Sequence, residues 1–197
     1  MFPEQFAYHR PTSVGEALHL LESYPDAKII AGGHSLLPAM KLRLAAPEAL
    51  IDIGRIPELK GIHVNGGVSI GATTTWYEIL TSDELKSVLP VLSETANVVG
   101  DLQVRSRGTL GGSMAHSDPA ADFTAVMLAL GASVTASSAG GESFDFNGRS
   151  LCRSADNVAR SERDLTSIEI PASALGIAAY EKRPSRIRIC RCRRGRC

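Results

Sequence analysis

The feature that most constrains this fold is a pair of adjacent glycines, Gly32 and Gly33, between an apolar segment and a helix-forming segment. Residues 28–31 predict a short strand, and residues 36–44 predict a helix with Ser35 as its N-cap. Glycines let a backbone approach a ligand closely, and a helix start presents unpaired N–H groups, so this turn suits a phosphate. Paired glycines also occur at strand–helix turns for packing alone, and both interpretations stay open.

A second pair of glycines lies in Thr109–Ser113, which reads TLGGS. Arg105 and Arg107 precede it, and Asp122 follows nine residues after its end. Two such segments could hold the two phosphates of a dinucleotide from opposite sides. Neither contains G-x-G-x-x-G or G-K-[ST], so the sequence supports neither a Rossmann site nor a P-loop.

The first 56 residues predict a small α/β unit with short connections. Ser13 and Glu16 match a capping box in front of helically spaced apolar residues, and residues 49–53 predict a second buried strand. Residues 57–61, which run from a proline to a glycine, mark a boundary between two subdomains.

Residues 57–182 predict a second subdomain that mixes helices with strands. The expected strands are 67–71, 133–136 and 165–170, and the expected helices are 75–80, 90–99 and 118–130. Asp118 is expected to cap the helix at 118–130, with Pro119 at its first position. The predicted fold class is therefore α+β.

Charge is divided unevenly along the chain. Seven of the 21 basic residues are arginines of residues 183–197, which leaves 14 basic against 21 acidic residues in 1–182. An acidic body offers no basic face for nucleic acid, so none is expected as a partner. No apolar run approaches the roughly 20 residues of a membrane span, and no signal peptide opens the chain.

Cysteine usage favours a cytoplasmic location. Cys152 is the only cysteine before residue 183, so the body has no disulfide framework, which suits a reducing compartment. The body also has no set of His, Cys and carboxylate side chains at metal-ligand spacing, and no metal is expected.

The two glycine segments carry a resemblance to a known family. Residues 31–44 (AGGHSLLPAMKLRL) and 107–123 (RGTLGGSMAHSDPAADF) resemble the FAD-binding medium subunit of molybdenum hydroxylases of the carbon monoxide dehydrogenase and xanthine dehydrogenase type. The segments FAYHRP, IEIP and AAYEK also fit this family. The resemblance covers roughly residues 1–140 and 164–182. It implies the two-subdomain FAD-binding fold of the PCMH (vanillyl-alcohol oxidase-like) type.

The resemblance also implies a set of cofactor contacts, with FAD extended between the subdomains. The first segment would wrap the pyrophosphate, the second would clamp it through backbone N–H groups and two hydroxyls, and a carboxylate, an apolar side chain and a lysine would complete the site. The implied residues are Ala31, Gly32, Gly33, His34, Ser35 and Leu36, then Thr109, Gly111, Gly112 and Ser113, and finally Asp122, Leu165 and Lys182.

Several nearby residues have simpler, structural interpretations. His34 either caps a turn or contacts the ligand, and His116 is expected to pack or to line the flavin edge rather than to transfer protons. Trp76 and Tyr77 are expected in the core or at an interface, and Cys152 is expected to be inert.

The family's role defines the expected function and partners. Electrons would pass from a large molybdopterin subunit through a small [2Fe–2S] subunit to FAD, and then to an external acceptor. The alternative is a truncated, non-catalytic remnant that keeps the fold but lacks a functional flavin site.

The sequence departs from the family in two places. Residues 147–163 are polar and arginine-rich where the family is apolar, and residues 183–197 have no family counterpart, whereas the family continues into a C-terminal domain. A frame shift or truncation is the favoured explanation for residues 183–197. The alternatives are an arginine-rich arm that binds nucleic acid or anionic lipid, and a metal clip of Cys190, Cys192 and Cys197, which lacks a fourth ligand.

Overall fold

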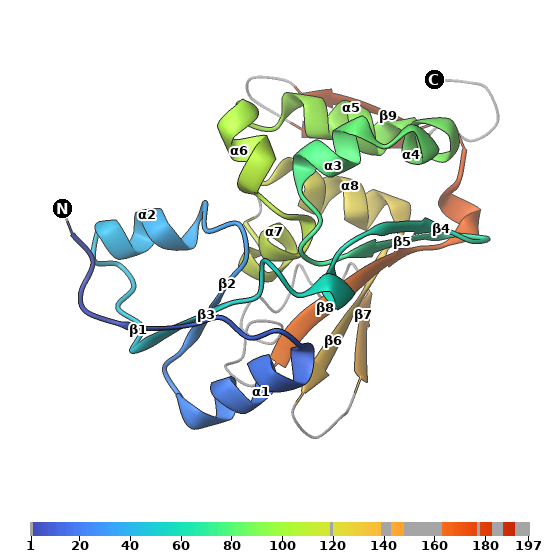
Figure 1. Cartoon of the computed structure of the whole chain (residues 1–197). Coiled ribbons are helices and arrows are strands. Elements are labelled where there is room, and N and C mark those ends of the chain that lie inside the picture. Colours follow the sequence, from blue (N-terminus) through green and yellow to red (C-terminus); the bar gives the residue numbers. More distant parts are fainter. Residues whose placement is uncertain are drawn as a thin grey trace.

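The computed structural model describes residues 2–118, 120–138, 143–147, 163–176, 178–182 and 187–191. A three-stranded sheet built from the first 52 residues lies to one side, and a larger body of helices and a five-stranded sheet follows (Figure 1). This mixture of helices and sheets confirms the predicted α+β class. No helix in the described ranges is long and apolar enough to cross a membrane.

The first sheet is parallel, in the order β1-β3-β2. Its strands are β1 (Ala7–His9), β2 (Lys28–Ile30) and β3 (Ala49–Asp52). Parallel neighbours need crossover connections, and α1 (Val14–Ser23) and α2 (Leu36–Lys41) provide them on opposite sides of the sheet (Figure 1). In β3, the first three residues, Ala49, Leu50 and Ile51, are apolar and buried. This pattern is typical of a central strand that is covered on both faces.

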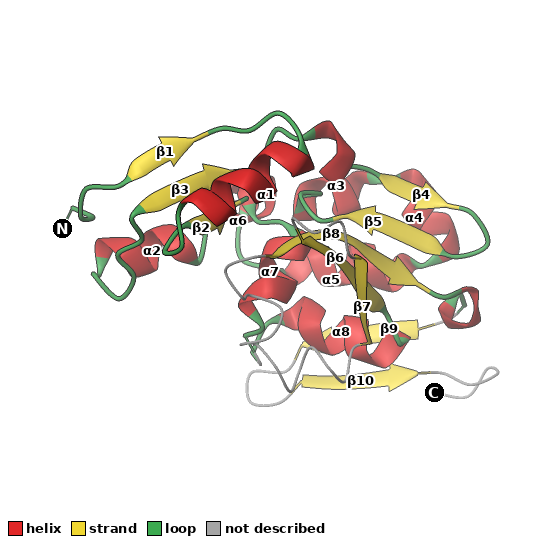
Figure 2. Ribbon diagram, turned by 90° about the horizontal axis from the view of Figure 1, so that it is seen from below, coloured by secondary structure: helices red, strands yellow, loops and turns green. Residues whose placement is uncertain are grey.

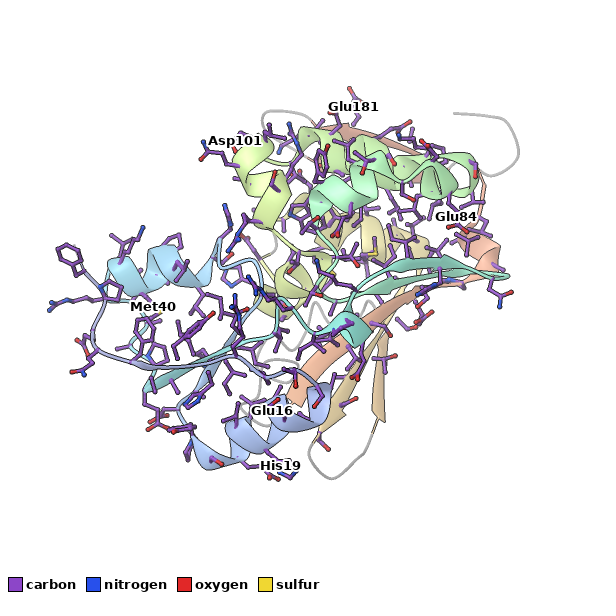
Figure 3. All side chains as sticks on the ribbon, in the orientation of Figure 1. Glu16, His19, Met40, Glu84, Asp101 and Glu181 are labelled. Carbon is purple, nitrogen blue, oxygen red and sulfur yellow. The ribbon has the colours of Figure 1, made fainter. Side chains whose placement is uncertain are left out.

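Each helix buries one face against this sheet. Leu18 and Leu21 of α1 form a core cluster with Ile51 of β3, and burying each such side chain contributes about 1.5–3 kcal/mol. Met40 of α2 is also buried, on the side of the helix that faces the sheet, whereas His19 of α1 lies on its outer side (Figure 3).

The second sheet is antiparallel, in the order β4-β5-β8-β6-β7. Its strands are β4 (Ile62–Val64), β5 (Val68–Gly71), β6 (Ser133–Ser138), β7 (Ser143–Asn147) and β8 (Arg163–Ile170). Alternating residues such as Val68, Ile70, Val134 and Ile168 are buried, which is the pattern of a sheet with one face on the core.

In the described part of the chain, six helices accompany this sheet, and all of them except α6 contribute buried residues to the second core. They are α3 (Trp76–Thr81), α4 (Asp83–Val88), α5 (Pro90–Val98), α6 (Leu102–Arg107), α7 (Leu110–His116) and α8 (Asp122–Leu130). Trp76 stacks on Phe123 with ring centroids 4.2 Å apart, which confirms a core position for Trp76. Tyr77 is exposed on α3.

A two-stranded ribbon forms the end of the described chain. β9 (Ala178–Lys182) pairs antiparallel with β10 (Ile187–Arg191), and the ribbon contacts α5 and α8 (Figure 2). β10 belongs to the segment with no expected family counterpart. Cys152, Cys192 and Cys197 lie outside the described residues.

Three local predictions were wrong in detail. The helix expected at 118–130 begins at Asp122, because the Asp118 carboxylate accepts the Ala120 N–H and closes a separate turn. The helix after the first glycines ends at Lys41, and Ser35 makes no side-chain capping bond. Glu16 bonds the backbone and hydroxyl of Thr12 instead of completing a capping box with Ser13.

The division into subdomains at residues 57–61 stays a prediction. The 3-10 helix η1 (Pro57–Leu59) occupies most of this segment, and Leu59 packs with the first core cluster. The second cluster begins at Val68.

Candidate functional site

A cavity of about 670 Å³ lies against both glycine segments. Every residue predicted to contact the cofactor lines it, except Lys182. Its walls come from β2 and the turn after it, from α7, from the start of α8, and from Leu165 of β8. The fold thus brings together residues that are more than 130 positions apart.

The first glycine segment is an open turn with unused donors. Gly33 has a φ of 73°, a left-handed conformation that favours glycine. Within the described part of the chain, the backbone N–H groups of residues 32–36 have no hydrogen-bond partner. The His34 ring lies 3.2 Å from the Gly32 carbonyl through Nδ1, a local contact that fits the turn interpretation of this histidine.

The two glycine segments are in direct contact. A Cβ added to Gly32 would lie 2.2 Å from the Arg107 carbonyl oxygen and 3.0 Å from the Gly108 Cα. Only a glycine allows the two backbones to approach this closely. The first turn is therefore held against the chain that leads into the second segment.

The second glycine segment is the first turn of helix α7, with Thr109 as its N-cap. Its backbone donors are already engaged: the N–H groups of Leu110 and Gly111 bond the Thr74 and Ala72 carbonyls, and Gly112 bonds the Thr109 hydroxyl oxygen. The Ser113 N–H bonds the Thr109 carbonyl. The backbone N–H groups of this segment are therefore engaged within the protein in this conformation, and the residues Thr109 and Ser113 line the cavity.

Asp122 anchors the far side of the cavity. It is only 9% exposed, and its Oδ2 lies 2.9 Å from Lys182 Nζ while its Oδ1 accepts a hydrogen bond from the Tyr180 hydroxyl. Lys182 thus reaches the site through Asp122. Burial and the bond to Asp122 raise the pKa of the Tyr180 hydroxyl above its usual range.

Tyr180 is the clearest residue that sequence reasoning missed. It stands two positions before Lys182 on β9, and residues two apart on a strand share a face. That alternation in AAYEK was the available signal. The apolar wall of Val99, Val104 and Trp76 was not predicted either.

The residues present fit FAD. The cavity volume lies within the usual range of cofactor pockets, about 300–1,000 Å³. Its free N–H groups suit a pyrophosphate, and apolar side chains such as Leu165 and Val99 suit flat rings.

Comparison with known families agrees with this geometry. Residues 4–173 match the family described as the FAD binding domain in molybdopterin dehydrogenase. The chain belongs to this family. FAD is accordingly the cofactor of this domain, as the resemblance implied. The individual contact residues stay predictions.

Named relatives include two medium chains. The chain is 52% identical over 132 residues to the carbon monoxide dehydrogenase medium chain of Hydrogenophaga pseudoflava, covering 66% of this chain and 46% of that protein. It is 42% identical over 142 residues to the glyceraldehyde dehydrogenase medium chain of Sulfolobus acidocaldarius, covering 72% and 50%. The chain thus spans about half the length of these curated relatives.

Solved structures show the same fold. Carbon monoxide dehydrogenase from Hydrogenophaga pseudoflava matches with a TM-score of 0.83 and 40% identity, over 94% of this chain and 66% of that chain. Quinoline 2-oxidoreductase from Pseudomonas putida 86 matches with a TM-score of 0.80 and 32% identity, over 92% and 63%.

Proposed function

We propose that this chain holds FAD in the cavity beside the two glycine segments and serves as the electron-transfer subunit of a molybdenum hydroxylase. The observation that carries the proposal is the open turn of residues 32–36, whose N–H donors lie at the cavity wall. Bound FAD would supply the redox chemistry, since flavins take up electrons and pass them on.

The first turn would bind the pyrophosphate. Its N–H groups are unpaired within the described residues, so a ligand can accept from them without displacing a bond of the protein. Gly32 allows the turn to lie against the Arg107 backbone, and Gly33 allows its left-handed conformation, so both glycines would support the position of these N–H groups at the cavity wall. The hydroxyls of Thr109 and Ser113 would donate from the second segment.

A polar network at the edge of the cavity would orient the cofactor. It consists of Asp122, Tyr180 and Lys182. Lys182 neutralises Asp122, and the raised pKa of Tyr180 keeps its hydroxyl protonated, so it donates to the carboxylate across the physiological range. In this network, Lys182 and Tyr180 would hold the Asp122 carboxylate at the cavity wall.

The expected partners follow from the family. Several relatives are named as medium chains or subunits, which supports a large molybdopterin subunit and a small [2Fe–2S] subunit as partners. The external acceptor would take electrons from FAD, and the assembly would work in the cytoplasm. The substrate would be selected in the large subunit.

Flavin binding by the full 197-residue chain tests the proposal. The protein is mixed with FAD, excess FAD is removed, and the bound flavin spectrum is recorded for the wild type, Gly33→Ala and Gly66→Ala. Both glycines have a φ near 70°, but Gly66 has nothing within 4 Å of an added Cβ and does not line the cavity. Backbone strain of roughly 1 kcal/mol is therefore common to both variants.

We expect stoichiometric FAD in the wild type and in Gly66→Ala, and at least a tenfold weaker affinity in Gly33→Ala. Equal affinity in both variants would move the pyrophosphate away from the first turn. A folded wild type that takes up no FAD would support the non-catalytic remnant instead.

A further inference from the structure

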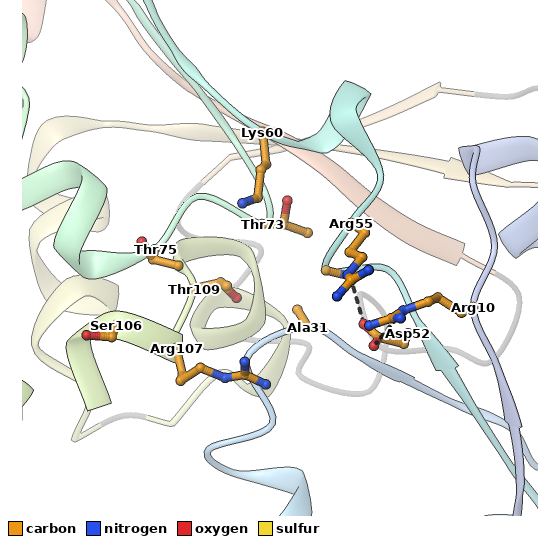
Figure 4. A pocket seen from close by; sticks show the side chains of 11 residues that line it. Arg10, Ala31, Asp52, Arg55, Lys60, Thr73, Thr75, Ser106, Arg107 and Thr109 are labelled. Atoms are coloured by element: carbon orange, nitrogen blue, oxygen red, sulfur yellow. Dashed lines mark hydrogen bonds and ion pairs between the residues drawn. The ribbon is translucent and has the colours of Figure 1, made fainter. Parts of the chain in front are cut away.

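A second cavity, of about 300 Å³, lies next to the flavin cavity and has a different character. Four cations line it: Arg10 after β1, Arg55 after β3, Lys60 after η1, and Arg107 at the end of α6 (Figure 4). They come from three parts of the chain, since Arg55 and Lys60 flank η1, so the fold, and not a local run of charge, gathers them.

Carboxylates compensate only part of the positive charge of this cavity. Among the residues that the structure describes, Asp52 is the one carboxylate that lines it, and its oxygens already accept from the Tyr8 hydroxyl and the Gly54 N–H. Arg10 Nε lies 3.7 Å from Asp52, and Lys60 Nζ lies 3.8 Å from Glu78. Within the described ranges, no carboxylate lies within 4.0 Å of the Arg55 or Arg107 guanidinium.

The cavity is positively charged, whereas residues 1–182 as a whole carry a net negative charge. Residues 1–182 carry 14 basic and 21 acidic residues, and four of those 14 basic residues line this one cavity. Like charges repel, so gathering them disfavours the empty site and favours an occupied one.

The cavity is separate from the proposed flavin site. The two share Ala31 and Thr109, and Gly32, which lines the flavin cavity, packs against the backbone of Arg107, which lines the second cavity. None of the four cations lines the flavin cavity.

We propose that this basic cavity is a second anion site, which binds a phosphate group as inorganic phosphate or on a small phosphorylated metabolite. Arg55 and Arg107 present planar guanidinium forks, the geometry that binds phosphate oxygens in pairs. Arg10 and Lys60 add charge from the remaining sides. The four side chains are exposed to solvent, so binding weakens as salt screens them.

Titration calorimetry on the full chain tests the site. Inorganic phosphate and glycerol 3-phosphate are titrated in turn at low, constant ionic strength, with chloride as the matched control anion, and with FAD both absent and saturating. The variants are Arg55→Gln and Arg107→Gln. Lys86→Gln is the control, because Lys86 lies on α4 and pairs with Asp83 away from the cavity.

We expect phosphate binding that chloride does not reproduce, that Lys86→Gln retains, and that each arginine variant weakens roughly tenfold through the loss of a charge-assisted hydrogen bond. Tighter binding of glycerol 3-phosphate would identify a metabolite as the source, and equal or weaker binding would identify free phosphate. Arg107→Lys should recover part of the affinity.

Three results would overturn the proposal. These are no phosphate binding, equal binding in the arginine variants and Lys86→Gln, or release of bound FAD by phosphate, which would place the anion in the flavin cavity. Because the titration without FAD stands alone, a failure of flavin binding leaves this test intact.

Discussion

The two glycine segments look alike in sequence and differ in structure. AGGHS is an open turn whose N–H groups have no partner within the described residues, whereas TLGGS is the capped start of a helix whose donors are engaged. In the first segment, Gly32 packs against the Arg107 backbone and Gly33 adopts a left-handed conformation, whereas in the second segment Gly111 packs against Ala72. A glycine pair therefore indicates a ligand only when its N–H groups are left unpaired.

The largest expected effect is that of Gly32→Ala, which breaks the contact between the segments. The new Cβ would lie 2.2 Å from a backbone oxygen that cannot rotate away. We expect a loss of roughly 3 kcal/mol in the free energy of unfolding, and loss of FAD binding. Urea unfolding and flavin titration measure the two effects.

The control for Gly32→Ala is Gly15→Ala in α1. Nothing lies within 4 Å of its added Cβ, so the better helix former should stabilise the protein by about 0.5–1 kcal/mol. If Gly32→Ala also folded and bound FAD normally, the two segments would not touch as described.

Gly111→Ala tests the role of glycine in the second segment. Its Cβ would lie 2.5 Å from the Ala72 Cβ and 2.6 Å from the Ala72 carbonyl oxygen, so we expect a destabilisation of about 2 kcal/mol. FAD affinity per folded molecule should remain near that of the wild type, because the Gly111 N–H already bonds Ala72. A stable variant that loses FAD would show that this glycine serves the ligand instead.

The smallest effect concerns Asp122, which follows the second segment. Tyr180→Phe removes one hydrogen bond to Asp122, and we expect a loss of about 1 kcal/mol at neutral pH. The folded-state pKa of Tyr180 lies above its ordinary value of about 10. The stability that this shift contributes is therefore present below about pH 10 and is lost as the pH rises through the raised pKa.

Unfolding curves from pH 8 to pH 11 measure that alkaline loss. Tyr180→Phe should show less of it than the wild type. Tyr77→Phe, at an exposed tyrosine, should behave like the wild type. An unchanged alkaline slope in Tyr180→Phe would remove Tyr180 from the Asp122 network.

Sequence reasoning succeeded where local signals decide the structure. Helix α1 begins after Ser13 as predicted, because capping and apolar spacing agree there. It did not predict helix α7, because glycines disfavour a helix and because the N–H groups of Leu110 and Gly111 bond the distant Thr74 and Ala72 carbonyls.

The same contrast holds for the candidate site. The glycine motifs and the family resemblance pointed to the two glycine segments and to Asp122, all of which line the flavin cavity. The contact between Tyr180 and Asp122 joins residues 58 positions apart, and the basic cavity draws on residues from Arg10 to Arg107, so only the folded chain shows these two groupings.

The strand order has a consequence for the sequence of folding events. β8 pairs with both β5 and β6, so the strand nearest the middle of the sheet is also its last in the chain. On a growing chain, the β1-β3-β2 sheet can close as soon as residue 52 is free, whereas the larger sheet must wait for residue 170. Leu165 is part of β8, so the wall that it contributes to the cofactor cavity forms only when β8 pairs with the sheet.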